Sequence, residues 1–294
     1  MHAAICVACG TQFPPSVDPP TECPICLDPR QYVPEEGQRW TTMEGLRGTH
    51  RNEVKQDGEL LGVGTTPSFA IGQRALLVPF GDRLLMWDCI TLLDDDSTAE
   101  IERRGGLAAI AISHPHYYSA MVEWAHRFQC PILLHSADAA HVVRRDPSIE
   151  HWDGDTRELG HGLTLLRLGG HFTGGTVLHW AGGAGGAGAL LSGDIVQVIP
   201  DRSHVGFMYS YPNLIPLPPA AVERIAAALE PWDFEQVVGA WWERIVPRDG
   251  KRVVRESAAR YVAAVEGRLP AEVTRRAAPP PDPGRATPGA SPRR

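Results

Sequence analysis

The sequence predicts an α/β fold preceded by a small cysteine-rich module. Short apolar runs alternate with helical patterns from residue 60 to about residue 267, which is typical of strands and helices in alternation. Two Cys-x-x-Cys pairs occur within the first 26 residues, apart from these runs. Several histidines and acids stand directly after apolar runs, where α/β proteins place ligands and chemistry. The length of 294 residues is sufficient for one large domain and a small appendage.

The first 40 residues form a module of their own. Cys6 and Cys9 are followed, after thirteen intervening residues, by Cys23 and Cys26. Four thiolates at this spacing suit a tetrahedral metal ion, and so short a segment needs a metal to fold. The pattern resembles zinc ribbons and short rubredoxin-like modules. We therefore expect Zn²⁺ at these cysteines, with iron as the alternative because both metals accept four thiolates.

Residues 41–59 are polar and are interpreted as a linker. The second domain begins at residue 60. Its first predicted strands are residues 67–80 and 83–91, joined by a Gly-Asp turn. A helix to Arg104 follows, with Ser97 as its expected N-cap.

The centre of the chain carries the first pair of candidate metal ligands. Residues 107–112 are apolar and β-branched and predict a buried strand, and residues 121–128 have a helical pattern. His114 and His116 lie between the two elements. Two neutral imidazoles at this spacing are able to bind one divalent metal from the end of the strand.

The remaining elements follow the same alternation. Gly169 and Gly170 precede His171, and the strand after a glycine-rich hairpin ends at Asp194. The other predicted strands cover residues 131–135, 176–180, 187–194 and 234–242, and the other predicted helices reach Val143 or cover residues 218–229 and 254–265. Residues 268–294 are rich in proline and arginine and are expected to be disordered.

The order of these motifs resembles the metallo-β-lactamase superfamily over residues 60–267. The motifs are H-x-H at 114 and 116, Gly-Gly-His at 169–171 and Ser-Gly-Asp at 192–194. The resemblance implies a four-layer αββα sandwich with a metal site at the edge between the two sheets. It also implies a role for each motif residue: the three histidines are first-metal ligands, Asp194 is the carboxylate that usually bridges two metals, and Asp88 supports the site from behind.

Two departures from the family pattern predict a site with a single metal. Tyr118-Ser119 stands where the family has Asp-His, and Gly239-Ala240-Trp241-Trp242 stands where the last strand normally supplies a histidine. Every residue specific to the second metal is therefore replaced.

These residues predict a mononuclear zinc hydrolase that acts on an ester, thioester or related carbonyl substrate through metal-bound hydroxide. Asp194 is the expected fourth ligand or base, and Tyr118 the expected hydrogen-bond donor to an oxyanion. Tyr117, Trp241 and Trp242 are expected to face the substrate. The alternatives are a non-catalytic binding or scaffold protein with the ribbon as docking module, and an iron-dependent redox protein.

Composition limits the class of partner. The net charge of −7 gives no reason to expect nucleic acid, and no apolar run is long enough to span a membrane. No signal peptide is expected, and six cysteines without an export signal favour metal ligation in a reducing compartment. The sequence thus predicts a cytoplasmic protein with a small-molecule substrate, and it leaves the oligomeric state open.

Overall fold

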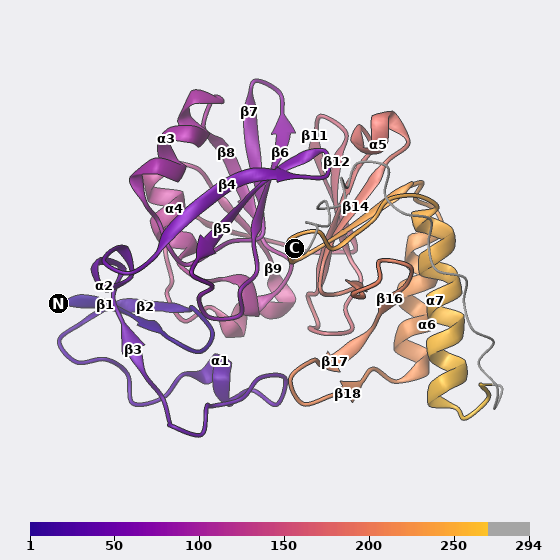
Figure 1. The fold of residues 1–294 in the computed structure, drawn as a ribbon, viewed down its shortest axis with the longest axis horizontal. Helices are drawn as coiled ribbons and strands as arrows, with labels where there is room; N and C mark the ends of the chain where they lie inside the picture. The colour runs from indigo at the N-terminus through magenta and orange to yellow at the C-terminus, as the bar shows by residue number, and fades with distance from the viewer. Residues whose placement is uncertain (270–294) are drawn as a thin grey trace, which may run out of the picture.

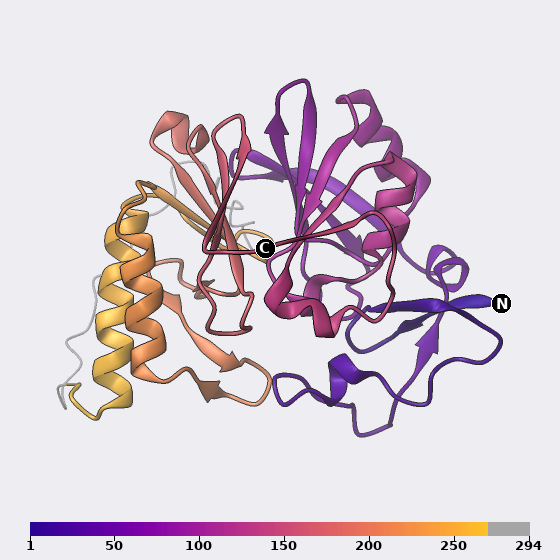
Figure 2. The same cartoon turned by 180° about the vertical axis from the view of Figure 1, so that it is seen from behind.

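Two β-sheets lie face to face, with helices on the outer face of each, in the computed structural model (Figure 1). The structure describes residues 1–269, so all but the first two residues of the predicted tail at 268–294 lie outside the described part. The view from behind shows the same layers, with the N-terminal module below one sheet (Figure 2). The predicted four-layer αββα sandwich is confirmed.

The first sheet has seven strands in the order β10-β9-β8-β7-β6-β5-β4. Strands β7, β8, β9 and β10 are parallel neighbours, and the rest pair antiparallel. Its strands are β4 (Arg51–Asp57), β5 (Leu60–Thr66), β6 (Ala75–Phe80), β7 (Arg83–Trp87), β8 (Leu107–Ala111), β9 (Ile132–His135) and β10 (Ile149–Trp152). Its helices are α3 (Asp95–Arg103), η1 (Pro115–Tyr117), α4 (Met121–Phe128) and η2 (Ser136–His141).

The second sheet has six strands in the order β11-β12-β13-β14-β19-β20. Helices α6 and α7 cover its outer face (Figure 1). Its strands are β11 (Thr156–Gly160), β12 (Leu163–Arg167), β13 (Thr176–Trp180), β14 (Ala189–Gly193), β19 (Gln236–Gly239) and β20 (Ile245–Val246). The helices are α5 (Gly183–Gly186), α6 (Pro219–Leu229) and α7 (Gly250–Val265), and two small ladders join β15 (Gln197–Val198) to β16 (Val205–Gly206) and β17 (Met208–Ser210) to β18 (Ile215–Pro216).

The apolar core has three layers because strand side chains alternate between the two faces of each sheet. On β7, Leu85 and Trp87 point into the layer between the sheets, where they join Leu178 and Leu191 of the second sheet. Met86 points to the opposite layer, beneath α3 and α4. A third layer lies between the second sheet and helices α6 and α7.

The N-terminal module contains a three-stranded sheet and one helical turn. Its strands are β1 (His2–Cys6), β2 (Gln12–Ser16) and β3 (Trp40–Thr41), in the order β2-β1-β3, and the turn is α1 (Pro24–Leu27). Its small buried cluster consists of the four cysteines with Phe13 and Ile25. This core is too small to stabilise the module by apolar burial alone.

Four predictions of local structure need correction. Residues 41–59 are not a linker, because they contain α2 (Met43–Arg47) and β4, which is the edge strand of the first sheet. The predicted strand at 67–80 begins only at Ala75, and the one at 234–242 ends at Gly239. The N-cap of α3 is Asp94, whose carboxylate accepts a hydrogen bond from the backbone N–H of Ser97.

Candidate metal centre

The end of β8 delivers the first two histidines. The chain leaves the strand in an extended conformation at His114 and then turns into the 3₁₀ helix η1, which begins at Pro115 and contains His116. Asp88 accepts a hydrogen bond from the backbone N–H of Ser113 at 2.8 Å. This carboxylate therefore fixes the backbone just before the histidine pair.

His114, His116 and His171 form one buried group, named here the histidine cluster. One nitrogen from each ring lies within 4.8 Å of the other two. His171 Nε2 is 3.3 Å from His116 Nδ1, and His114 Nε2 is 3.3 Å from Asp194 Oδ1. The structure thus brings the three predicted histidines together with the predicted carboxylate, which belongs to a different sheet from the first pair.

The other ring nitrogens of two histidines are held by hydrogen bonds. His171 Nδ1 lies 3.1 Å from the carbonyl oxygen of Met208, so Nδ1 carries the proton and Nε2 keeps its lone pair. His114 Nδ1 lies 2.9 Å from the Ser113 hydroxyl. The Met208 contact therefore directs a lone pair of His171 toward the centre of the cluster, and the Ser113 contact fixes the orientation of the His114 ring.

The chemistry of these residues fits a divalent metal such as zinc. The histidine cluster and Asp194 are at most 5% exposed, yet His116 Nε2 has no hydrogen-bond partner, and His114 Nε2 and Asp194 Oδ1 have only the 3.3 Å contact with each other. Unpartnered buried polar atoms are costly and call for an explanation. Three imidazole nitrogens and one carboxylate oxygen are a common ligand set for zinc.

Burial sets the charge of this group at neutral pH. It lowers the pKa of His114 and His116 well below the usual range, and it lowers the pKa of His171 to about 4. It raises the pKa of Asp194 to about 7 and that of Asp88 to about 7. The imidazoles are therefore neutral at pH 7, the form that binds metals.

Tyr117, and not Tyr118, lies at the cluster. The Tyr117 ring centre is 4.4 Å from that of His114, and its hydroxyl lies close enough to Asp194 to offset part of the rise in the pKa of this carboxyl. Tyr118 is buried among Thr11, Val122 and their neighbours. The predicted role of Tyr118 as an oxyanion donor therefore needs correction, because its ring packs against α4 and the N-terminal module.

The two tryptophans lie away from the histidines. The Trp242 ring lies over β5, where a Cβ on Gly62 would be 2.5 Å from it, and the Lys55 ammonium is 4.4 Å from the ring centre. Trp241 donates from Nε1 to the carbonyl of Ile71 and packs on the layer beneath α4. That both rings face the substrate therefore stays a prediction, and the contacts observed for each ring are with other parts of the fold.

A buried ion pair lies where the family places its last histidine. Arg74 donates to Asp57 at 2.5 Å and to the carbonyl of Gly239 at 2.8 Å, and both side chains are at most 4% exposed. Asp57 also accepts a hydrogen bond from the backbone N–H of Glu243. The Arg74 guanidinium, and not a metal ion, therefore holds the backbone where β19 ends.

Three residues at the cluster were not found from the sequence. The Phe172 ring packs against His114, His116 and His171, and the Tyr211 hydroxyl donates to the backbone carbonyl of Asp194 at 2.8 Å. Arg30, from the N-terminal module, donates to the carbonyl of His171. Of the three, only Phe172 could have been found from the sequence, because it directly follows the predicted ligand His171.

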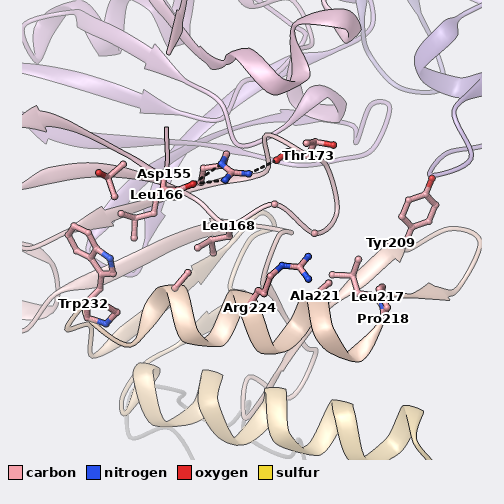
Figure 3. Close-up of a pocket in the computed structure, with 16 residues that line it drawn as sticks. Asp155, Leu166, Leu168, Thr173, Tyr209, Leu217, Pro218, Ala221, Arg224 and Trp232 are labelled. Atoms are coloured by element: carbon pink, nitrogen blue, oxygen red, sulfur yellow. Dashed lines mark hydrogen bonds and ion pairs between the residues drawn. The ribbon is translucent and has the colours of Figure 1, made fainter. Parts of the chain in front are cut away.

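A groove lies next to the third histidine (Figure 3). Its volume is about 800 Å³, and it runs between the 166–173 segment and α6. Leu166, Leu168 and Trp232 give it an apolar lining, and Arg224 of α6 adds a positive charge. Gly169 and Gly170, which directly precede His171 in the sequence, line one part of it.

The four N-terminal cysteines form the second candidate metal site, named here the thiolate cluster. Cys6 Sγ is 3.5 Å from Cys26 Sγ, Cys9 Sγ is 3.6 Å from Cys23 Sγ, and all four sulfurs lie within 4.8 Å of one another. All four are free thiols, and Gln38 donates to Cys6 Sγ at 3.0 Å. This arrangement is compatible with a zinc ribbon.

Comparison with solved structures identifies the fold. The metallo-β-lactamase DIM-1 has a TM-score of 0.54 at 13% identity, with 73% of this chain and 98% of the other covered. VMB-1 has a TM-score of 0.54 at 15% identity, again with 73% and 98% covered. These likenesses show that the chain has the metallo-β-lactamase fold.

Comparison of sequences gives one clear relative. No protein-family model matches the chain. The uncharacterized protein YmaE of Bacillus subtilis (strain 168) is 47% identical over 268 residues, which cover 90% of this chain and 97% of that protein. With a metallo-β-lactamase fold and this degree of identity, the chain belongs to the same protein family as Bacillus subtilis YmaE.

Proposed function

We propose that this protein is a metal-dependent hydrolase with one zinc ion at the histidine cluster and a second, structural metal at the thiolate cluster. The observation that carries the proposal is the convergence of three neutral imidazoles and one buried carboxylate, in which His114 Nε2, His116 Nε2 and Asp194 Oδ1 have no hydrogen-bond partner outside the group. Zinc in such a site lowers the pKa of water and polarises a carbonyl.

The residues around the histidine cluster have different roles in the proposed hydrolysis. Asp194 Oδ1 lies 3.3 Å from His114 Nε2, where it would act as the fourth metal ligand or orient a metal-bound water. Tyr117 stands beside this carboxylate and modulates its pKa. His171 and His114 are held by Met208 and Ser113, so both rings are already oriented for metal binding.

We propose an ester, thioester or related carbonyl compound as the substrate. The groove beside Gly170 supports this class, because its apolar side chains suit an acyl chain or ring and Arg224 of α6 suits an acidic group on it. The second arginine of the groove, Arg167, is paired with Asp155. A second metal ion at the histidine cluster is not part of the proposal, because Tyr118, Ser119 and the segment from Gly239 supply no ligands for it.

Elemental analysis of the full chain tests the metal centre. We expect two metal ions per chain in the wild type and one in a His114→Ala, His116→Ala double variant, with zinc and iron told apart by the same measurement. Generic acyl esters should be turned over by the wild type and not by Asp194→Ala. A wild type that holds only the metal of the thiolate cluster would contradict the proposal.

The burial of the cluster favours a second candidate, a non-catalytic binding protein. The four ligand side chains are at most 5% exposed, so substrate access requires the surrounding segments to move. In this case the wild type would retain two metals and bind a partner through the N-terminal module, without hydrolysing any acyl ester. Turnover that depends on Asp194 decides against this candidate.

The compartment is part of the proposal. Six free cysteines, four of them gathered in the thiolate cluster without a disulfide, suit a reducing environment such as the cytoplasm. Among residues 1–269, no helix combines the length and the apolar character needed to cross a bilayer.

A further inference from the structure

Arg30 of the N-terminal module reaches the wall of the histidine cluster. Its guanidinium lies 3.7 Å from the ring centre of Phe172, and Nη1 donates to the carbonyl oxygen of His171 at 3.3 Å. The side chain is 14% exposed. Figures 1 and 2 both show the segment after α1 meeting the β17–β18 hairpin. A residue far away in the sequence therefore contacts both the third ligand and its aromatic neighbour.

The position of Arg30 is fixed from both sides. Within its own module, Nε and Nη2 each donate to Asp28 at 2.6 Å, a bidentate pair that sets the plane of the guanidinium. From the second sheet, Ser210 donates to the carbonyl of Arg30, and Asn213 donates to the carbonyls of Pro29 and Gln31. Because Asp28 follows Cys26 by two residues, the geometry of this pair depends on the folded thiolate cluster.

The contacts of Arg30 extend to the metal ligands. The Phe172 ring beneath the guanidinium packs edge-on against His116 and His171, with ring centres 4.8 and 5.1 Å apart. His171 Nδ1 is bound by the carbonyl of Met208, two residues before Ser210 on β17. The Arg30 segment thus contacts both chain segments that orient the third ligand.

We propose that Arg30 is a positioning residue for His171, through which the metal of the thiolate cluster and the metal of the histidine cluster stabilise one another. The inference rests on the proposed metal at the histidine cluster. A small module built on four cysteines folds only with its metal, so loss of that metal releases Arg30. Groups that orient a ligand change metal affinity by about 10 to 100-fold, and coupling between two sites is reciprocal.

The first experiment loads the full chain with Co²⁺, whose absorption distinguishes four thiolates from histidine and carboxylate ligands. Arg30→Ala should weaken Co²⁺ binding at the histidine cluster about tenfold and leave the thiolate bands unchanged. Arg39→Ala is the matched control, because Arg39 is an exposed arginine of the same module. Arg30→Lys should give an intermediate affinity, since lysine keeps the charge and loses the bidentate pair.

The second experiment measures reciprocity. A thiol-competitive chelator should remove the metal of the thiolate cluster more slowly from the wild type than from the His114→Ala, His116→Ala variant, and this difference should vanish in Arg30→Ala. Equal behaviour of Arg30→Ala and Arg39→Ala in both experiments would overturn the inference.

A third readout separates this inference from the proposed function. If the wild type takes up metal at the thiolate cluster alone, the proposed function and the coupling both fail. Positioning by Arg30 is then decided by amide hydrogen exchange at residues 171–175. Faster exchange there in Arg30→Ala, but not in Arg39→Ala, supports positioning, and unchanged exchange overturns it.

Discussion

Single side chains at the histidine cluster have protonation states that differ from those of the same groups in water. Burial lowers the pKa of His171 to about 4 and raises that of Asp194 to about 7. In the metal-free protein near pH 6, the imidazoles are therefore neutral while Asp194 still carries its proton. Metal binding at this site must remove the proton from Asp194 and none from the histidines.

This difference predicts proton release on metal binding. Below about pH 7 the binding of Zn²⁺ at the histidine cluster should release one proton from Asp194, so affinity should rise with pH and level off above pH 7. Asp194→Asn should abolish the release. Calorimetry in buffers of different ionisation enthalpy measures it, and an unchanged release in the variant would show that another group supplies the proton.

The two adjacent tyrosines offer a matched test of the site. Tyr117 lowers the pKa of Asp194 by its proximity, so Tyr117→Phe should move the midpoint of proton release to higher pH. Tyr118→Phe should leave the midpoint where it is, because Tyr118 packs against α4. A shift with Tyr118→Phe and none with Tyr117→Phe would contradict the placement of the two rings.

Among the secondary-structure elements, the edge strand β4 is tied to the second sheet by charge. Asp57 at the end of β4 pairs with Arg74 ahead of β6, and Arg74 in turn binds the carbonyl at the end of β19. The pair is almost fully buried, so each partner depends on the other for its stability.

Breaking this pair should strongly destabilise the fold. Asp57→Ala leaves the Arg74 guanidinium buried without its counter-charge, and the free energy of unfolding should fall by about 3 to 5 kcal/mol. Urea denaturation measures the change. Glu53→Ala on the same strand breaks only exposed pairs with Arg51 and Lys55 and should cost less than about 1 kcal/mol. If both variants lowered the free energy of unfolding equally, the buried pair would contribute no more to stability than the exposed pairs.

The turn between β13 and β14 offers a second test of stability, at two glycines with positive φ. Gly188 has a φ of +87°, and a Cβ there would lie 2.3 Å from the carbonyl oxygen of Asp233. Gly186 has a φ of +96° with nothing within 4 Å of such a Cβ. Gly186→Ala should cost about 1 to 2 kcal/mol for the backbone conformation alone. Gly188→Ala should lower the stability further, because its Cβ would also clash with the Asp233 carbonyl. If Gly188→Ala melts at no lower a temperature than Gly186→Ala, the clash is excluded.

At the scale of the whole molecule, the N-terminal module and the αββα sandwich depend on different forces. The sandwich has three buried apolar layers, whereas the module has one small cluster around its cysteines. Chelation of the metal at the thiolate cluster should therefore raise amide exchange in residues 1–40 while β8 and β14 remain protected. Uniform loss of protection would show instead that the two parts unfold together.

The sequence was informative where the signal is local. His114, His116, His171 and Asp194 each follow a strand or a glycine turn, and the topology of an α/β fold brings such positions to one edge. Strand β4 was missed because its polar residues belong to an edge strand, which buries few of its side chains. Arg30 and Tyr211 were missed because their roles arise from contacts across 141 and 17 residues, which no local pattern records.

The Arg74–Asp57 pair also limits how this protein can be redesigned. A histidine introduced into residues 239–242 would meet a guanidinium that already binds the Gly239 carbonyl and lies under the Trp242 ring. A metal ligand that displaced either partner of this buried pair would leave the other charge without its counter-charge. Conversion to a two-metal centre therefore requires the joint replacement of Arg74 and Asp57, together with new ligands at residues 118 and 119. No single substitution achieves this exchange.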